Sequence, residues 1–172
     1  MKSNLSILRA CHSRQVSLLM KEYAPLLNLN PEEAGLCGWL HDFGYISGNN
    51  CNHAKIGGKL LHDQGYKYWK EISTHGSCDG LFSPLGVLLN IADMSVDHRG
   101  KTVSFEERLD DVAKRYGRTS TQWENCLSLI AALKKTDEWA IIQSTLGKAH
   151  SEPTKDQIED TLVSLGPGEM QP

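Results

Sequence analysis

Residues 35–44 have the sequence GLCGWLHDFG, and the interpretation of the whole chain depends on this stretch. It predicts the end of a helix that presents an adjacent histidine and aspartate, His41 and Asp42, and then stops at a glycine. Asn30 is a favourable N-cap for that helix, with a proline after it in the first turn. At a helix end, both side chains can reach one point, where a neutral imidazole and an ionised carboxylate form half of a metal site. For this pair taken alone, the alternative is a buried histidine hydrogen-bonded to its neighbour.

The composition indicates one globular domain without a dominant charge. The 172 residues are 40% hydrophobic, which is enough for a sizeable core in a single domain. The formal net charge of −3 does not indicate a nucleic-acid-binding protein. No apolar run is long enough to span a bilayer, and we recognise no secretory signal. We therefore expect a cytoplasmic protein without membrane or nucleic-acid partners, and the sequence does not indicate its oligomeric state. The five scattered cysteines, without a CxxC pair, are expected to be reduced thiols.

Apolar positions recur at spacings of three and four along the chain, and no stretch alternates as a strand would. We therefore expect an all-α fold, a single-domain helical bundle over residues 1–165, with residues 166–172 as a disordered tail. The helix over residues 105–116 carries mostly charges typical of a solvated face, Arg108 among them. Capping residues place the other helices at 4–23, 31–43, 53–64, 68–75, 84–97, 121–133 with a restart near 137, and 153–165.

Five of these helices each carry a metal-capable side chain on an apolar row or at its end. Asp93 lies in the centre of the apolar face of its helix, with no lysine or arginine on the same row. An ionised carboxylate there costs several kcal/mol unless it is paired or bound to a metal, the alternative being an aspartate hydrogen-bonded to backbone groups. Imidazoles and carboxylates that converge in a core are satisfied by one or two divalent ions such as manganese, iron, cobalt, nickel or zinc. The candidate ligands are His12, His41, Asp42, His53, His75 and Asp93.

The order His, His-Asp, His, His, Asp resembles that of the HD superfamily of metal-dependent phosphohydrolases, and in particular its dinuclear branch. The matching motifs lie within residues 4–116 and are RACHS at 9–13, LHDFG at 40–44, NHAKIG at 52–57, THG at 74–76 and IAD at 91–93. The resemblance implies an HD-type helical bundle with a first metal held by His12, His41, Asp42 and Asp93, and a second held by Asp42, His53 and His75. For His53 and His75, the alternative is that they are ordinary polar residues at helix ends. Residues 120–172 add no motif.

The resemblance also implies an activity. An HD protein of this kind hydrolyses a nucleotide or another phosphate ester or anhydride, with a metal-activated hydroxide that attacks phosphorus. The layout is most similar to small bacterial members that split symmetrical dinucleoside polyphosphates, a likeness supported by Arg99 after the aspartate helix. We expect Asp42 to be catalytic, and Lys55 and Arg99 to hold phosphate oxygens. The alternative for each cation is a solvated surface charge.

Two other functions remain open at this stage. A minority of HD proteins use the same ligand set as a di-iron centre that activates oxygen. A non-catalytic, metal-stabilised domain that binds nucleotides and regulates a partner is the third possibility, although an intact ligand set argues against it.

Overall fold

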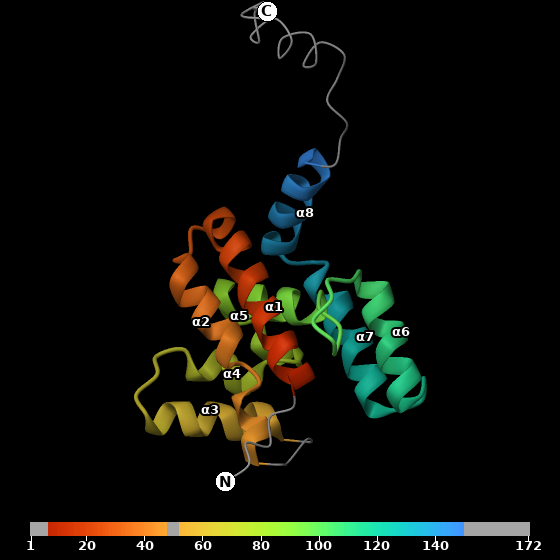
Figure 1. Cartoon of the computed structure of the whole chain (residues 1–172). Helices are drawn as coiled ribbons and strands as arrows, with labels where there is room; N and C mark the ends of the chain where they lie inside the picture. Colours follow the sequence, from red (N-terminus) through yellow and green to blue (C-terminus); the bar gives the residue numbers. More distant parts are fainter. Residues whose placement is uncertain (1–6, 48–51, 150–172) are drawn as a thin grey trace, which may run out of the picture. The chain divides into compact units, whose positions relative to one another are not determined.

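A computed structural model describes residues 7–47 and 52–149, and in these ranges the regular elements are helical (Figure 1). The expectation of an all-α fold is thus confirmed, because within the described ranges strand pairing is limited to one isolated bridge, between Val96 and Thr102. The α-helices are α1 (Ile7–Tyr23), α2 (Pro31–Leu40), α3 (His53–Asp63), α4 (Trp69–Thr74), α5 (Pro84–Met94), α6 (Phe105–Tyr116), α7 (Thr121–Leu133) and α8 (Asp137–Ala149). Short 3₁₀ helices follow three of them as η1 (Ala24–Leu27), η2 (Phe43–Ser47) and η3 (Cys78–Gly80).

Side-chain caps fix where several helices begin. The Asn30 side chain accepts hydrogen bonds from two backbone N–H groups in the first turn of α2, at 2.9 and 3.1 Å. Ser104 and Glu107 form the reciprocal capping box that starts α6. These contacts satisfy backbone donors that a helix otherwise leaves unpaired at its N-terminus. The local sequence is therefore enough to place these starts.

Two helix ends and one cap differ most from the prediction. Helix α2 ends at Leu40, and not near residue 43. Helix α5 ends at Met94, not near Asp97, because Val96 pairs with Thr102 across a turn in which the Asp97 N–H donates to a carbonyl at 2.9 Å. The sequence predicts a capping box of Thr121 and Glu124 for α7, but the cap is Ser120, which accepts a hydrogen bond from the backbone N–H of Trp123. The predicted residues 4–6 of the first helix, the helix at 153–165 and the tail at 166–172 lie outside the described residues.

Helix α5 forms the centre of the core and carries fully buried side chains such as Leu88 and Leu89. Helices α1 and α2 pack against each other and against α5, α3 packs on α4 and η2, and α6 packs on α7 (Figure 1). Helices α1, α2, α4 and α7 contact α5, and α3 reaches the same region through α4. His12, His41, His53 and His75 therefore converge on the region that contains Asp42 and Asp93. The packing thus positions the site.

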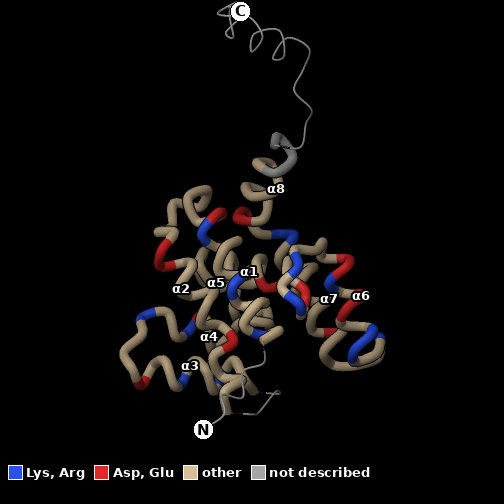
Figure 2. The backbone as a smooth tube through the Cα atoms, in the orientation of Figure 1, with Lys and Arg blue, Asp and Glu red and all other residues tan. Residues whose placement is uncertain are grey.

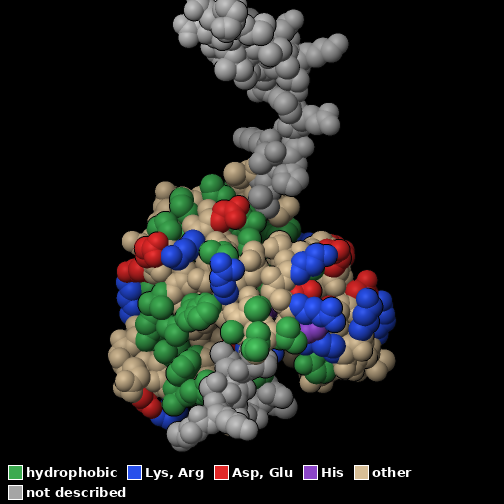
Figure 3. Space-filling view, viewed as in Figure 1, with side chains coloured by type: hydrophobic (Ala, Val, Ile, Leu, Met, Phe, Trp, Pro, Cys, Tyr) green, Lys and Arg blue, Asp and Glu red, His purple; other side chains and the backbone are tan. Residues whose placement is uncertain are grey.

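The described residues as far as Ile142 form one compact unit, and those from Gln143 onward belong to a second. On the surface of the first unit, hydrophobic side chains gather over α2 (Figure 3), where Leu36 and Trp39 are both about half exposed. In the part of the chain that is described, each helix is too short or too polar to cross a membrane.

Candidate metal centre

Asp42 lies at the centre of a cluster that contains all six candidate ligands. Its carboxylate is 3% exposed, and its Oδ2 lies 3.4 Å from the Nε2 of His41. Its other oxygen, Oδ1, lies 3.3 Å from the Nε2 of His53 and 3.6 Å from that of His75. The ligand atoms form three overlapping groups, each within 4.8 Å, which are His12–His41–Asp42, His41–His75–Asp93 and Asp42–His53–His75.

The ends of short helices aim these side chains. His41 follows the last residue of α2, and the chain then turns into η2, which packs against α3. His75 follows α4 with an extended backbone, at φ −62° and ψ 155°, and Gly76 takes a positive φ of 77° that favours glycine. Both histidines thus lie at the residue where the chain leaves a helix. Their imidazoles are therefore not restricted to the directions that side chains take within a regular helix.

Three histidines are held in one tautomer by backbone carbonyls. The Nδ1 atoms of His12, His41 and His75 lie 2.9, 2.7 and 2.6 Å from the carbonyl oxygens of Asp97, Gly38 and Ile72. A carbonyl only accepts, so Nδ1 carries the proton and donates it. In the neutral ring, the Nε2 atom therefore presents a lone pair, which is the state in which histidine binds a metal. Without a metal, the hydrogen bond between His12 and Asp93, at 3.0 Å, requires a second proton, on Nε2.

The chemistry of these donors fits divalent ions. The Nε2 of His41 is fully buried and has no hydrogen-bond partner among the described residues. The Nε2 atoms of His53 and His75 lie only 3.2 Å apart, beside the carboxylate of Asp42. Buried imidazole nitrogens that converge on two carboxylates are costly without a partner and favourable around a cation. Imidazole and carboxylate together suit manganese, iron, cobalt, nickel and zinc.

The two carboxylates of the centre are ionised at neutral pH. Burial opposes their charge, but the pKa of Asp42 is held well below its usual range by His41, by the hydrogen bond with His75 and by Arg9. Burial likewise opposes the charge of Asp93, yet its hydrogen bond with His12 and the nearby cationic groups lower its pKa. Both aspartates can therefore serve as anionic ligands.

The same burial makes the stability of the metal-free protein depend on pH. Burial lowers the pKa of His41 to about 4, from an ordinary value of 6.5. The unfolded chain then binds a proton that the folded chain excludes, so His41 contributes stability above pH 6.5 that is lost as the pH falls toward 4. At about 1.4 kcal/mol per pKa unit, we expect the free energy of unfolding to fall by about 3 kcal/mol across this window.

Urea unfolding in EDTA between pH 4.5 and 7.5 measures this loss. His75 acts in the opposite direction, because Asp42 outweighs the effect of burial and raises its pKa, so its contribution is lost as the pH rises. His41→Asn should flatten the slope below pH 6.5, whereas His62→Asn, at a surface position, should leave it unchanged. An unaltered slope in His41→Asn would contradict the assignment.

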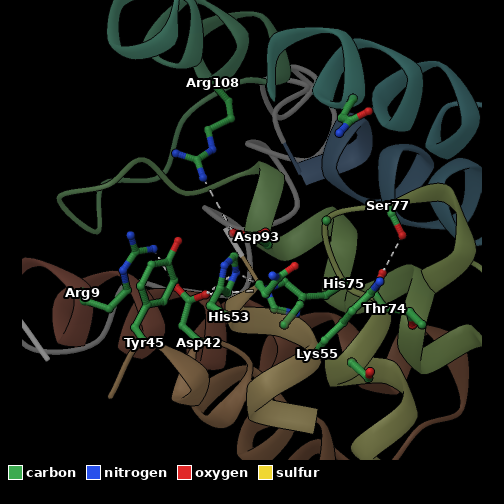
Figure 4. Close-up of a pocket in the computed structure, with 15 residues that line it drawn as sticks. Arg9, Asp42, Tyr45, His53, Lys55, Thr74, His75, Ser77, Asp93 and Arg108 are labelled. Atoms are coloured by element: carbon green, nitrogen blue, oxygen red, sulfur yellow. Dashed lines mark hydrogen bonds and ion pairs between the residues drawn. The ribbon is translucent and has the colours of Figure 1, made fainter. Parts of the chain in front are cut away.

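Two arginines that were not predicted to belong to the centre also reach it. The Nη1 of Arg9 donates to the Oδ2 of Asp42 at 2.7 Å, and the Nη2 of Arg108 lies 3.8 Å from the Oδ1 of Asp93 (Figure 4). Arg9 could have been found from its position one turn before His12. Arg108 could not, because it is one of several charges along α6 (Figure 2).

The two cations that the sequence suggested for phosphate binding have different positions. Lys55 lines the pocket above the centre, and its side chain extends toward Thr74 (Figure 4). Arg99 is exposed and is absent from the pocket lining, and its Nε donates to His98 at 3.4 Å. The reason is the turn after α5, in which Asp97 accepts the backbone N–H of Arg99 and keeps that residue at the surface. Of the two arginines that follow α5, the geometry thus favours Arg108 over Arg99 as a phosphate-binding cation of the pocket.

A comparison with family models identifies the fold around the centre. The model of the HD domain matches residues 9–163, which include all six candidate ligands. The chain belongs to the HD-domain family. HD domains bind divalent metals, and the superfamily consists in general of metal-dependent phosphohydrolases that act on small phosphorylated substrates. Searches of curated proteins and of solved structures returned no match.

Proposed function

We propose that this HD-domain protein is a dinuclear metal-dependent phosphohydrolase that acts on a nucleotide or another small phosphate ester or anhydride. The observation that carries the proposal is that Asp42, at the floor of one pocket, has its Oδ2 near His41 and its Oδ1 near His53 and His75. A carboxylate shared by two ions about 3.5–4 Å apart is typical of hydrolases that polarise phosphate oxygens.

The six candidate ligands can be divided between two ions, although His41, Asp42 and His75 each occur in two of the three ligand groups. One ion would be held by residues of α1, the α2 end and α5, and the other by the shared aspartate with residues of α3 and the α4 end. When bound, a divalent ion polarises phosphate oxygens and lowers the pKa of water from about 15.7 toward 7. The first set is His12, His41, Asp42 and Asp93, and the second is Asp42, His53 and His75.

The pocket above the ions has the size and lining for a small anion-bearing substrate. Its volume is about 430 Å³, and its wall includes the cations Arg9, Lys55 and Arg108. Fixed cations in a partly enclosed site hold phosphate oxygens and stabilise the charge that develops as the bond to phosphorus breaks. Neutral hydrogen-bonding groups complete the wall, from Asn52, Ser73, Thr74, Ser77 and Asn125.

The proposal is tested by metal analysis and a phosphate-release screen. Protein purified without oxygen is loaded in turn with manganese, iron, cobalt, nickel or zinc, and is offered nucleotides, dinucleoside polyphosphates and sugar phosphates. We expect about two ions per chain and phosphate release that EDTA abolishes. Oxygen consumption by the iron form without phosphate release would favour the di-iron oxygenase. Nucleotide binding without turnover under any metal would favour the regulatory domain.

A further inference from the structure

Tyr45 contributes the only ring other than imidazole to the described pocket lining, and its two faces are covered. The guanidinium of Arg9 lies 4.0 Å from the centroid of the tyrosine ring, and the His53 ring stacks on it at 4.2 Å with an interplanar angle of 21°. Two groups this close to one centroid cannot share a face, and Figure 4 shows Tyr45 between Arg9 and His53. The tyrosine therefore offers no free face to a ligand.

This arrangement bears on how a nucleobase could be held. Proteins that bind unpaired bases often stack them on aromatic side chains. A base could reach the Tyr45 ring only by displacing Arg9, which also pairs with Asp42 at 2.7 Å. The four residues between the described ranges, 48–51, include no aromatic side chain. The described lining thus provides no stacking platform.

Arg108, in contrast, has an unused hydrogen-bond donor in the wall of the same pocket. Its side chain is 11% exposed, and its Nη1 donates to Asp111 at 3.3 Å. Its Nε is buried without a hydrogen-bond partner among the described residues. A buried guanidinium N–H needs an acceptor oxygen, and the planar fork of arginine matches the oxygens of a phosphate.

We infer that the pocket recognises its substrate by a phosphate group held at Arg108 and does not hold a nucleobase by stacking. The inference rests on the proposed function for the identity of the site. It predicts that ligands with the same phosphate groups bind with similar affinity whatever base they carry. It also predicts that inorganic phosphates without any base bind.

Equilibrium binding tests the inference without requiring turnover. The probes for calorimetry on the Mn²⁺-loaded full chain are inorganic imidodiphosphate and the β,γ-imido analogues of ATP and GTP. We expect the two nucleotide analogues to bind within about threefold of each other, a difference below 1 kcal/mol, and imidodiphosphate to bind measurably. A preference of more than about tenfold for one base, or no binding of imidodiphosphate, would overturn the inference. Absence of phosphate release in the earlier screen would instead count against the proposed function alone.

Arg108→Gln tests the role of the arginine. We expect it to weaken imidodiphosphate binding by about tenfold to a hundredfold, and both nucleotide analogues by the same factor, since a hydrogen bond to a charged group contributes about 1.5–3 kcal/mol. Arg108→Lys should be intermediate, because lysine keeps the charge but loses the fork. The matched control is Arg118→Gln, which removes a cation paired with Asp110 at the surface and should change nothing.

A purely structural role for Arg108 would give a different result. Because its Nη2 lies 3.8 Å from Asp93, the arginine could serve only to hold that carboxylate in place. Arg108→Gln would then weaken Mn²⁺ binding in the absence of any anion. Unchanged Mn²⁺ affinity with weakened imidodiphosphate binding supports the inference, and an equal loss of both overturns it.

Discussion

Replacement of Asp42 by asparagine is expected to reduce phosphate release by about a thousandfold or more, since losing even one donor at a charged transition state costs about 10²–10³. Asp42 approaches ligand atoms of both metal groups, with its Oδ2 toward His41 and its Oδ1 toward His53 and His75. Asparagine keeps the shape of the side chain but removes its charge, so both ions lose an anionic ligand. Phosphate release and the number of Mn²⁺ ions per chain measure the effect, and we expect the metal content to fall with the activity.

The matched control is His62→Ala. His62 belongs to α3, like His53, but its side chain is 57% exposed and lies outside the ligand groups. We expect wild-type metal content and activity within about twofold, as for most surface substitutions. Equal and mild effects of the two changes would remove Asp42 from the centre and the proposed mechanism with it.

Gly44→Ala is expected to lower the free energy of unfolding by about 1–3 kcal/mol and to remove the second of the two proposed metals. A Cβ at this position would overlap the carbonyl oxygen of His53 and lie 2.7 Å from the backbone nitrogen of Gly57. Both contacts are with backbone of α3, so η2 and α3 must move apart. That movement shifts His53 away from Asp42, and Mn²⁺ stoichiometry should fall from two toward one while the chain remains folded.

Gly65→Ala separates this steric effect from ordinary backbone strain. Gly65 has a positive φ of 75°, and a Cβ there would meet nothing within 4 Å. The substitution should therefore cost about 1–2 kcal/mol through strain alone and leave the metal content unchanged. If Gly44→Ala kept both metals, the close packing of η2 on α3 would not be what holds the second group together.

Much of the fold could be predicted because the signals are local. The caps at Asn30 and Ser104 depend on residues within one turn, so the sequence places the starts of α2 and α6. The turn after α5 could not be predicted, because it depends on pairing between Val96 and Thr102. The ligands were predicted for a similar reason, since a polar side chain on an apolar row stands out against its neighbours.

The cations around the site show where this reasoning stops. Arg99 and Arg108 both follow the aspartate helix and both lie among other charges, so sequence alone gave no reason to prefer the second. Their positions depend on how α6 packs after the turn, which leaves Arg99 at the surface and brings Arg108 to Asp93. Likewise, the tautomer of His12 is set by the carbonyl of Asp97, 85 residues away.

The sequence by itself thus determined the helical class and which imidazoles and carboxylates lie on apolar rows, because helical periodicity and burial act over a few residues. Only the tertiary structure decided which arginines face the ligand groups and which aromatic face is covered. Those features depend on distances between side chains of different helices, and such distances are fixed only when the helices pack.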